Sequence, residues 1–238
     1  MNHRQMLKIC PTLLLSSIAF LLPFSISSCG NKVPHDALPL SVFDISDDGV
    51  INGFKQFSDE EINELTNQYR VLYIYHKTGD TYIKKIADNA FAQPVGGKTI
   101  LLNINKLQFD PRLQLETIGD YAFKNCNMFN GGITIPKTVN YIGKEAFYNC
   151  AGFNTNLTLY EVLEIGDNAF DGCANFNVLK IYDWQKTPTW TGSEIFSNWS
   201  NNGEISRRIL AYNCVDSNAH KVNLFLQTLG FPTNWIEG

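Results

Sequence analysis

Three cysteines recur at a nearly constant spacing, and a thiol can take part in several kinds of chemistry. Cys126, Cys150 and Cys173 lie 24 and 23 residues apart along the chain. A nucleophilic thiolate needs a base beside it, and none of the four histidines shares this spacing. A tetrahedral zinc site needs four ligands, more than three evenly spaced cysteines supply. We therefore expect a column of buried free thiols, because free cysteine packs as a small apolar side chain. A disulfide between successive cysteines and a metal site are the alternatives.

The stretch DISDDGVIN at 44–52 imitates the start of a calcium-binding loop. Oxygen-bearing side chains stand at its first, third and fifth places, and a glycine stands at its sixth. The twelfth place, where such a loop needs a glutamate, is Lys55, whose charge opposes a cation. We interpret the stretch instead as a hairpin turn between 42–43 and 50–51.

A cluster of carboxylates at Asp59, Glu60 and Glu61 is a further candidate for acid–base chemistry. The cluster opens the sequence SDEEINELTNQY, in which Ser58 can cap a helix and acidic residues favour the first turn. This role accounts for the carboxylates without catalysis. The histidines stand too far apart in sequence to show the spacing of a metal site or a catalytic triad. We expect no enzymatic activity and no cofactor.

The cysteines close a nine-residue unit that occurs three times in register. Its copies are IGDYAFKNC at 118–126, IGKEAFYNC at 142–150 and IGDNAFDGC at 165–173. Each copy leads into a short alternation of apolar and polar residues, which predicts a strand with one buried face. These predicted strands lie at 133–135, 157–159 and 179–181. The repeated positions that we expect to stack, copy upon copy, are Ile118, Ile142, Ile165, Phe123, Phe147, Phe170, Cys126, Cys150 and Cys173.

Two degenerate copies flank these three. The upstream copy at 83–91 keeps the pattern, except that Ala87 replaces the glycine, and we expect 99–102 to supply its strand. An insertion at about 107–113 separates it from the next copy. Downstream, Ile195-Phe196 takes the place of Ala-Phe. Degenerate end copies are typical of solenoids, because the last coil must present a polar face to water.

The repeated unit resembles the BspA-type leucine-rich repeat, whose motif reads IGxxAFxxC, and the likeness covers about residues 80–200. KTPTWTGSEIF at 186–196 also looks like the closing unit of that family. The resemblance implies a mostly β fold with short helices, arranged as a leucine-rich-repeat-like right-handed solenoid of about five rungs. It also implies a surface protein used for adhesion or protein binding. The corresponding division is an N-terminal cap segment at 42–82, repeats at 83–200 and a closing unit at 201–238.

The first 28 residues have a different character. A basic head with Arg4 and Lys8 precedes an apolar run, and Ile26-Ser27-Ser28 stands directly before Cys29. This order is typical of an export signal, and its end resembles a bacterial lipobox. We expect removal of 1–28, acylation of Cys29 by chains such as palmitate, and a tether over 29–41. The alternatives are a leader that stays as a membrane-spanning anchor and a secreted protein without lipid.

The charge of the chain argues against one class of partner. The formal net charge is −4, and removal of Arg4 and Lys8 with the signal makes it −6. No cluster of lysine and arginine remains, so we expect no binding to nucleic acid.

A repeat solenoid meets its partners through the outer face of its strands. The candidate binding residues on that face are Thr134, Thr158, Lys180, Tyr160, Tyr182 and Trp184. We expect a lipid-anchored protein at the bacterial cell surface, whose solenoid binds proteins, with host or extracellular-matrix components as partners. The alternative is a substrate-binding lipoprotein that feeds a transporter. All four tryptophans lie in the last 55 residues, where they either bind a partner or cap the solenoid.

Overall fold

The computed structural model describes residues 32–93, 99–183, 190, 192–196, 208–212, 227 and 236–237. The predicted signal, Cys29, Trp184 and most of the predicted closing unit lie outside these residues. Within the described part, no helix has the length and apolar character needed to cross a membrane.

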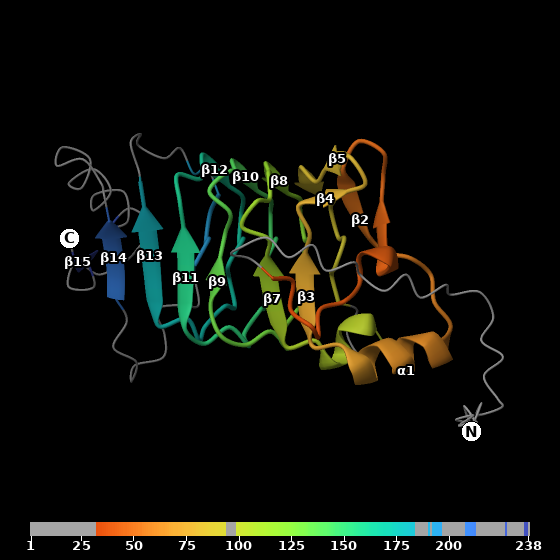
Figure 1. Cartoon of the computed structure of the whole chain (residues 1–238). Helices are drawn as coiled ribbons and strands as arrows, with labels where there is room; N and C mark the ends of the chain where they lie inside the picture. The colour runs from red at the N-terminus through yellow and green to blue at the C-terminus, as the bar shows by residue number, and fades with distance from the viewer. Residues whose placement is uncertain are drawn as a thin grey trace, which may run out of the picture. The chain divides into compact units, whose positions relative to one another are not determined.

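Two β-sheets form the two long faces of the described chain, which passes from one to the other in every repeat (Figure 1). One sheet has the order β1–β2–β6–β8–β10–β12. Its strands are β1 (Phe43–Ile45), β2 (Val50–Phe54), β6 (Lys85–Ile86), β8 (Thr117–Ile118), β10 (Tyr141–Ile142) and β12 (Glu164–Ile165). We call it the motif sheet, because the isoleucines of the nine-residue unit lie in it.

The second face is built from longer strands, and we call it the outer sheet. Five of them follow the order β15–β14–β13–β11–β9, and β3 and β7 form a separate pair that continues the same face (Figure 1). The strands are β3 (Val71–Ile74), β7 (Lys106–Phe109), β9 (Ile133–Thr134), β11 (Asn156–Leu159), β13 (Val178–Tyr182), β14 (Arg208–Tyr212) and β15 (Ile236–Glu237).

The other elements with described bounds lie in the N-terminal half. They are a small hairpin of β4 (Lys77–Thr78) and β5 (Thr81–Tyr82), the helix α1 (Asp59–Gln68), and the 3₁₀ turns η1 (Leu40–Val42) and η2 (Ile100–Asn103). The chain is therefore mostly β with few short helices, as the repeat pattern predicts.

Parallel pairing places equivalent residues of successive repeats side by side. Ile142 pairs with Ile118 on one neighbouring strand and with Ile165 on the other. The pairs β1–β2 and β4–β5 are antiparallel hairpins. Because each repeat adds one strand to each sheet, any side chain recurring in the motif must form a column through the molecule.

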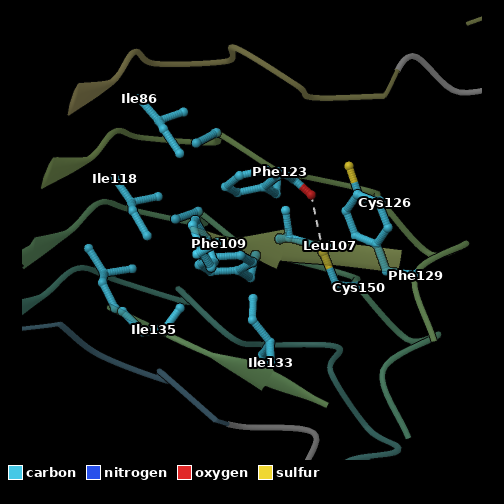
Figure 2. Close-up of a cluster of buried hydrophobic side chains, with 14 of the residues drawn as sticks. Ile86, Leu107, Phe109, Ile118, Phe123, Cys126, Phe129, Ile133, Ile135 and Cys150 are labelled. Carbon is cyan, nitrogen blue, oxygen red and sulfur yellow. Dashed lines mark hydrogen bonds between the residues drawn. The ribbon is translucent and has the colours of Figure 1, made fainter. Parts of the chain in front are cut away.

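Aromatic columns fill the space between the sheets. Five phenylalanines from successive coils stack with their ring centroids 5.0–5.5 Å apart. They are Phe91, Phe123, Phe147, Phe170 and Phe196. Figure 2 shows part of this core, in which Leu107 and Phe109 of β7 point from the outer sheet toward the isoleucines of the motif sheet.

The motif glycine is required by the close approach of neighbouring coils. A Cβ added at Gly143 would lie 2.5 Å from the backbone nitrogen of Asp120 in the preceding coil. That nitrogen cannot move without disturbing the coil, so a larger residue does not fit here. The Ile-Gly pair of the motif thus combines one buried side chain with one point of backbone contact.

The N-terminal cap segment contributes strands to both sheets. The predicted hairpin turn is present, with β1 and β2 joined at Gly49, whose φ is +83°. The predicted helix is present as α1, and the Ser58 hydroxyl and the Glu61 carboxylate form a reciprocal capping box with backbone N–H groups. β2 pairs with β6 and β3 with β7, so this segment supplies the first coil of the stack.

The strand assigned to the upstream degenerate copy was wrong. Residues 100–103 form η2, and the strand of this copy is β7 at Lys106–Phe109. Thr99 accepts a hydrogen bond from the Leu101 backbone and starts the turn. A short apolar run is compatible with either a strand or a buried helical turn, so its pattern alone misleads. Compared with the next repeat, most of the extra residues therefore precede β7, and the remainder lie between Leu107 and Ile118, in the region of the predicted insertion.

Candidate binding surface

The predicted binding residues of the three regular repeats lie in one row across the outer sheet. Thr134 of β9 pairs with Thr158 of β11, which pairs with Lys180 of β13. Residues paired in a parallel sheet point to the same face, so the row is continuous. Thr134 is exposed and Lys180 half-buried, whereas Thr158 between them is only 9% exposed. Thr158 therefore belongs to the row but exposes little surface between its neighbours.

Two tyrosines border this row. The rings of Tyr160 and Tyr182 lie 5.6 Å apart, tilted by 31°, and both residues are half-buried. They follow β11 and end β13, so they add an aromatic step beside the threonines and Lys180. Trp184, the remaining predicted member, lies outside the described residues.

The cysteine column is interior packing. Cys126, Cys150 and Cys173 are free and buried. Each thiol donates a hydrogen bond to the carbonyl of a phenylalanine in the preceding coil, and Figure 2 shows the bond from Cys150 to Phe123. The three sulfur–oxygen distances are 3.1–3.2 Å. The preferred expectation of free thiols is thus confirmed over the disulfide.

Burial makes these thiols poor nucleophiles. It raises the pKa of Cys126, and together with the neighbouring thiol of Cys173 it raises the pKa of Cys150 well above its usual value. A thiol that stays protonated neither attacks an electrophile nor binds a metal. In the described part of the chain, no group of three or more histidine, cysteine or acidic side chains could hold a metal ion.

The two acidic motifs of the sequence, the calcium-like stretch at 44–52 and the carboxylates at 59–61, have local structural roles. In the calcium-like stretch, the Ser46 hydroxyl donates to the Asp48 carboxylate and to the Val50 carbonyl across the hairpin. In the second motif, Glu61 accepts from the Ser58 backbone at the start of α1. Turn formation and helix capping therefore account for Ser46, Asp48 and Glu61.

The structure brings together one polar cluster that sequence reasoning missed. Asp110 follows β7, and its fully buried side chain contacts His76 Nδ1 at 3.0 Å. The Arg112 guanidinium donates to both carboxylate oxygens, at 3.0 and 2.8 Å, and the Arg112 backbone N–H donates at 2.9 Å. His76 and Asp110 are 34 residues apart, so no spacing in the sequence could reveal the pair.

Asp110 is the electrostatic centre of this cluster. Burial alone would raise its pKa, but the hydrogen bonds from Arg112 and the contact with His76 outweigh it and hold the pKa at about 2. The nearby hydroxyl of Tyr73 is buried and has no hydrogen-bond partner among the described residues. Burial, followed by the Asp110 carboxylate, raises the pKa of that hydroxyl. The carboxylate is therefore ionised and fully engaged at neutral pH.

The His76–Asp110 pair resembles half of a catalytic dyad, but its surroundings favour a structural role. Within the described residues, no serine, threonine or cysteine side chain hydrogen-bonds to the His76 ring. The Asp110 charge is shared with Arg112 and is not reserved for the imidazole. The cluster holds the C-terminal end of β7 in place.

A groove opens beside this cluster, where the outer sheet is discontinuous. It has a volume of about 400 Å³ and lies between β7 and β9. Lys106, Gln108 and Asp110 line it on the β7 side, and Thr134, Lys137 and Tyr160 line it on the other. Two residues of the predicted binding face, Thr134 and Tyr160, thus form one wall of a concave site.

The family model of the BspA-type leucine-rich repeat region matches residues 67–128 and 116–234, with six copies. A solved structure of a leucine-rich-repeat protein of T. pallidum is similar, with 14% sequence identity and a TM-score of 0.43. The similarity covers 84% of this chain and 98% of that one. Comparison with curated proteins finds no match. Because the family model spans residues 67–234, well over half of the chain, the protein belongs to the family of BspA-type leucine-rich repeat proteins.

Proposed function

We propose that this protein is a cell-surface lipoprotein whose outer sheet binds another protein. Leucine-rich-repeat domains generally bind proteins, and BspA-like members are typically associated with cell surfaces. The observation that carries the proposal is the continuous row of Thr134, Thr158 and Lys180, flanked by Tyr160 and Tyr182. Because the sheet already holds this row in place, its side chains lose little conformational entropy on binding. This favours binding of a partner through a broad, preformed contact surface.

The chemistry of the described residues supports binding over catalysis. Burial raises the pKa of Cys126 and Cys150, the acidic motifs stabilise turns and caps, and Arg112 and His76 engage the ionised Asp110 carboxylate. The row on the outer sheet presents the hydroxyl groups of Thr134 and Thr158, the lysine Lys180, and the rings of Tyr160 and Tyr182. Tyrosine is enriched among the residues that dominate protein–protein binding energies.

Host or extracellular-matrix proteins are the partners that we propose to test first. The purified chain is immobilised, and binding of a panel of matrix proteins and of intact host cells is measured by surface plasmon resonance and adhesion assays. We expect at least one partner with a Kd at or below the micromolar range. Tyr182→Ala with Lys180→Glu should weaken that binding about tenfold or more, since aromatic anchors commonly contribute over 1 kcal/mol.

A matched variant on the opposite face controls this experiment. Lys85→Glu also reverses the charge of a strand lysine, but this lysine is exposed and lies in the motif sheet. It should leave binding unchanged. Equal losses in both variants would point to nonspecific attraction and count against the outer sheet as the binding surface.

The groove of about 400 Å³ favours a second candidate, capture of a small solute for a transporter. A solute that binds the native state raises the unfolding temperature as its concentration rises. If a library of small solutes stabilises the chain while no protein binds at micromolar concentration, this second function replaces the first.

The lipid anchor at Cys29 is a separate part of the proposal. Acylation by more than one chain would hold the protein stably on a membrane. Cys29→Ala should therefore move the protein from the membrane fraction to the soluble fraction of expressing cells. Retention of the variant in membranes would show that the leader itself anchors the chain.

A further inference from the structure

The second half of the segment expected as a tether is part of the fold. The Asp36 carbonyl accepts hydrogen bonds from the N–H groups of Arg70 and Val71 at 2.9 and 3.1 Å, and the Leu38 N–H donates to the Val71 carbonyl at 2.9 Å. Ala37 forms a parallel bridge with Val71. Neighbouring strands alternate along a chain in the side to which their backbone groups point, so this segment lies on the side of β3 opposite β7.

Burial fixes the same segment in place. Leu38 and Val42 are buried in the main core, and the Tyr75 hydroxyl donates to the Leu38 carbonyl at 2.9 Å. The Ala37 N–H donates to the Pro34 carbonyl at 3.1 Å, which closes a turn at the start of the segment. Full burial of one leucine side chain contributes about 1.5–3 kcal/mol, so the segment does not leave the fold easily. The folded part of the chain therefore begins at Pro34.

Few residues separate this point from Cys29, the residue proposed above to carry the lipid. The intervening residues are the four from Gly30 to Val33. An extended chain advances at most about 3.6 Å per residue, so Pro34 stays within roughly 17 Å of the acylated cysteine. We call residues 30–33 the leash.

The leash joins the molecule at one end of the stack. β1 is the end strand of the motif sheet, and the bridge at Ala37 lies beyond β3 at the same end of the outer sheet. The later coils follow from β7 to β15 in one direction (Figure 1). From Phe91 to Phe196 the core advances by four stacking steps of 5.0–5.5 Å, or about 20 Å. The far coils are therefore more distant from the leash than the leash is long.

The charge of the chain gives the far coils no attraction to a lipid surface. The net charge is −4, and it becomes −6 when residues 1–28 are removed. The sequence has no run of about four or more lysine and arginine residues, the feature that anionic headgroups recruit. At the leash end, the first turn of α1 carries Asp59, Glu60 and Glu61. The lipid surface thus repels the chain, and only the leash holds it there.

We propose that the N-terminal coil of the solenoid faces the lipid bilayer at close range and that the later coils project away from it. This inference rests on the lipid anchor proposed above. The facing surface consists of residues 34–38 and the adjoining C-terminal end of α1. The row on β9, β11 and β13 then stands clear of the headgroups, where a soluble partner reaches it, but the short leash obliges that partner to approach the bilayer closely.

Resonance energy transfer from the protein to the lipid tests this orientation. The acylated full chain is placed in vesicles that carry acceptor dyes on their headgroups. A donor dye is attached through an azide residue introduced at Gln68, beside the leash, or at Glu194, on the coil that carries Phe196, and both sites are exposed. Transfer from Gln68 should be about twofold higher, because the leash keeps this end about half as far from the headgroups. Equal transfer from both sites would show that the solenoid lies flat and would overturn the proposal.

Lengthening the leash identifies the cause of the difference. An insertion of about 24 glycine and serine residues after Gly30 spans roughly 27 Å on average, so transfer from Gln68 should fall toward the value at Glu194. The same segment appended after Gly238 is the matched control and should leave the transfer unchanged. Circular dichroism and the melting temperature verify that each variant is folded. If the insertion after Gly30 has no effect, the leash does not set the distance and the proposal is overturned.

The Cys29→Ala variant separates the orientation from the anchor. If the wild type sediments with membranes and the variant does not, the anchor stands, and the transfer pattern alone decides the orientation. If both proteins stay soluble, the lipid anchor fails and the inference fails with it. The soluble variant should not bind vesicles of phosphatidylglycerol and phosphatidylcholine. Binding of the variant would show that the protein surface itself, and not the leash, holds the chain, and would overturn the proposal.

Discussion

The regular repeats at 118–182 and the N-terminal region at 32–113 are built on the same two sheets but are stabilised differently. In the regular repeats, identical side chains stack, and every strand has a neighbour from an equivalent coil. In the N-terminal region the sheet breaks beside β7, and a buried charged cluster around Asp110 secures the strand end. Stacking produces a uniform surface, whereas its interruption produces a concave, charged one.

The difference teaches where specificity arises in such a protein. A solenoid of perfect copies exposes a periodic face, which offers area but little chemical variety. β7 shares no ladder with β9, and the groove lies between these two strands. The predictions that follow compare the two regions, beginning with the largest effect.

The phenylalanine column should dominate stability in the regular repeats. Phe147 is fully buried and stacks on a ring at 5.0 Å on one side and at 5.1 Å on the other. Phe147→Ala should lower the free energy of unfolding by about 4 kcal/mol. Phe54→Ala, at the half-buried N-terminal end, should lower it by about 2 kcal/mol. Urea denaturation measures both, and equal losses would show that the end coil is as cooperative as the centre.

The Asp110 cluster should matter most in the N-terminal region. Asp110→Asn leaves Arg112 and His76 without their carboxylate and should lower stability by about 3 kcal/mol at neutral pH. The exposed Asp80→Asn in the β4–β5 turn is the control and should change stability by less than about 0.5 kcal/mol. A negligible loss at Asp110 would mean that apolar packing alone holds β7.

The same cluster predicts a pH dependence. The pKa of Asp110 is about 2, below its ordinary value of 3.8, so the folded state binds its proton less readily than the unfolded state does. Its contribution is therefore complete above pH 3.8 and is lost as the pH falls toward 2. The stability difference between wild type and Asp110→Asn should shrink over this window in acid-titrated urea melts.

The close contact at the motif glycine should have an intermediate effect. Gly143→Ala forces a methyl group against the Asp120 backbone and should lower stability by about 2 kcal/mol. Gly79 adopts a φ of +55° in open space, and Gly79→Asn should cost less than about 1 kcal/mol, because asparagine tolerates this conformation. Thermal melts of both variants show whether the spacing between coils or the geometry of the turns matters more for the stability of the stack.

The cysteine column should give the smallest effect on stability. Cys150→Ala removes one buried sulfur and its hydrogen bond to Phe123, so the expected loss is about 1 kcal/mol. Because burial raises the pKa of Cys126 and Cys150, both should resist iodoacetamide at pH 8 until urea unfolds the chain. Peptide mass spectrometry resolves the individual sites, and rapid labelling of the native protein would contradict the buried column.

These raised pKa values also predict how the free energy of unfolding changes at alkaline pH. The folded state keeps the thiol protons that the unfolded state releases above about pH 8.5. The contribution of Cys126 and Cys150 is therefore fully present below that pH and declines as the pH rises further. In urea melts at increasing pH, the free energy of unfolding of Cys150→Ala should therefore fall less steeply than that of the wild type.

Much of the regular region could be predicted, because each of its features occurs several times. Ile142 and Phe147 recur at fixed offsets, and a side chain that recurs at the coil period must stack in a solenoid. The strand containing Thr158 follows from local alternation in the same way. Its low exposure did not follow, because crowding depends on both neighbouring strands.

The N-terminal region was less predictable, because its features occur once. The apolar run at 100–103 fits a strand as well as the turn that it forms, and nothing repeats nearby to decide between them. His76 and Asp110 meet across 34 residues of sequence. Lys106 and Lys137 line one groove only because β7 and β9 end beside each other without pairing.

The amino-acid sequence by itself determined the family, the stacking order and the column formed by Cys126, Cys150 and Cys173, because side chains that recur at the coil period come into contact in every coil. The tertiary structure alone decided where the sheet breaks, which charges meet at Asp110 and which surface is concave. The physical reason is that a repeated contact is specified in every copy of the motif. A contact made once depends on the path of the whole chain between its two partners.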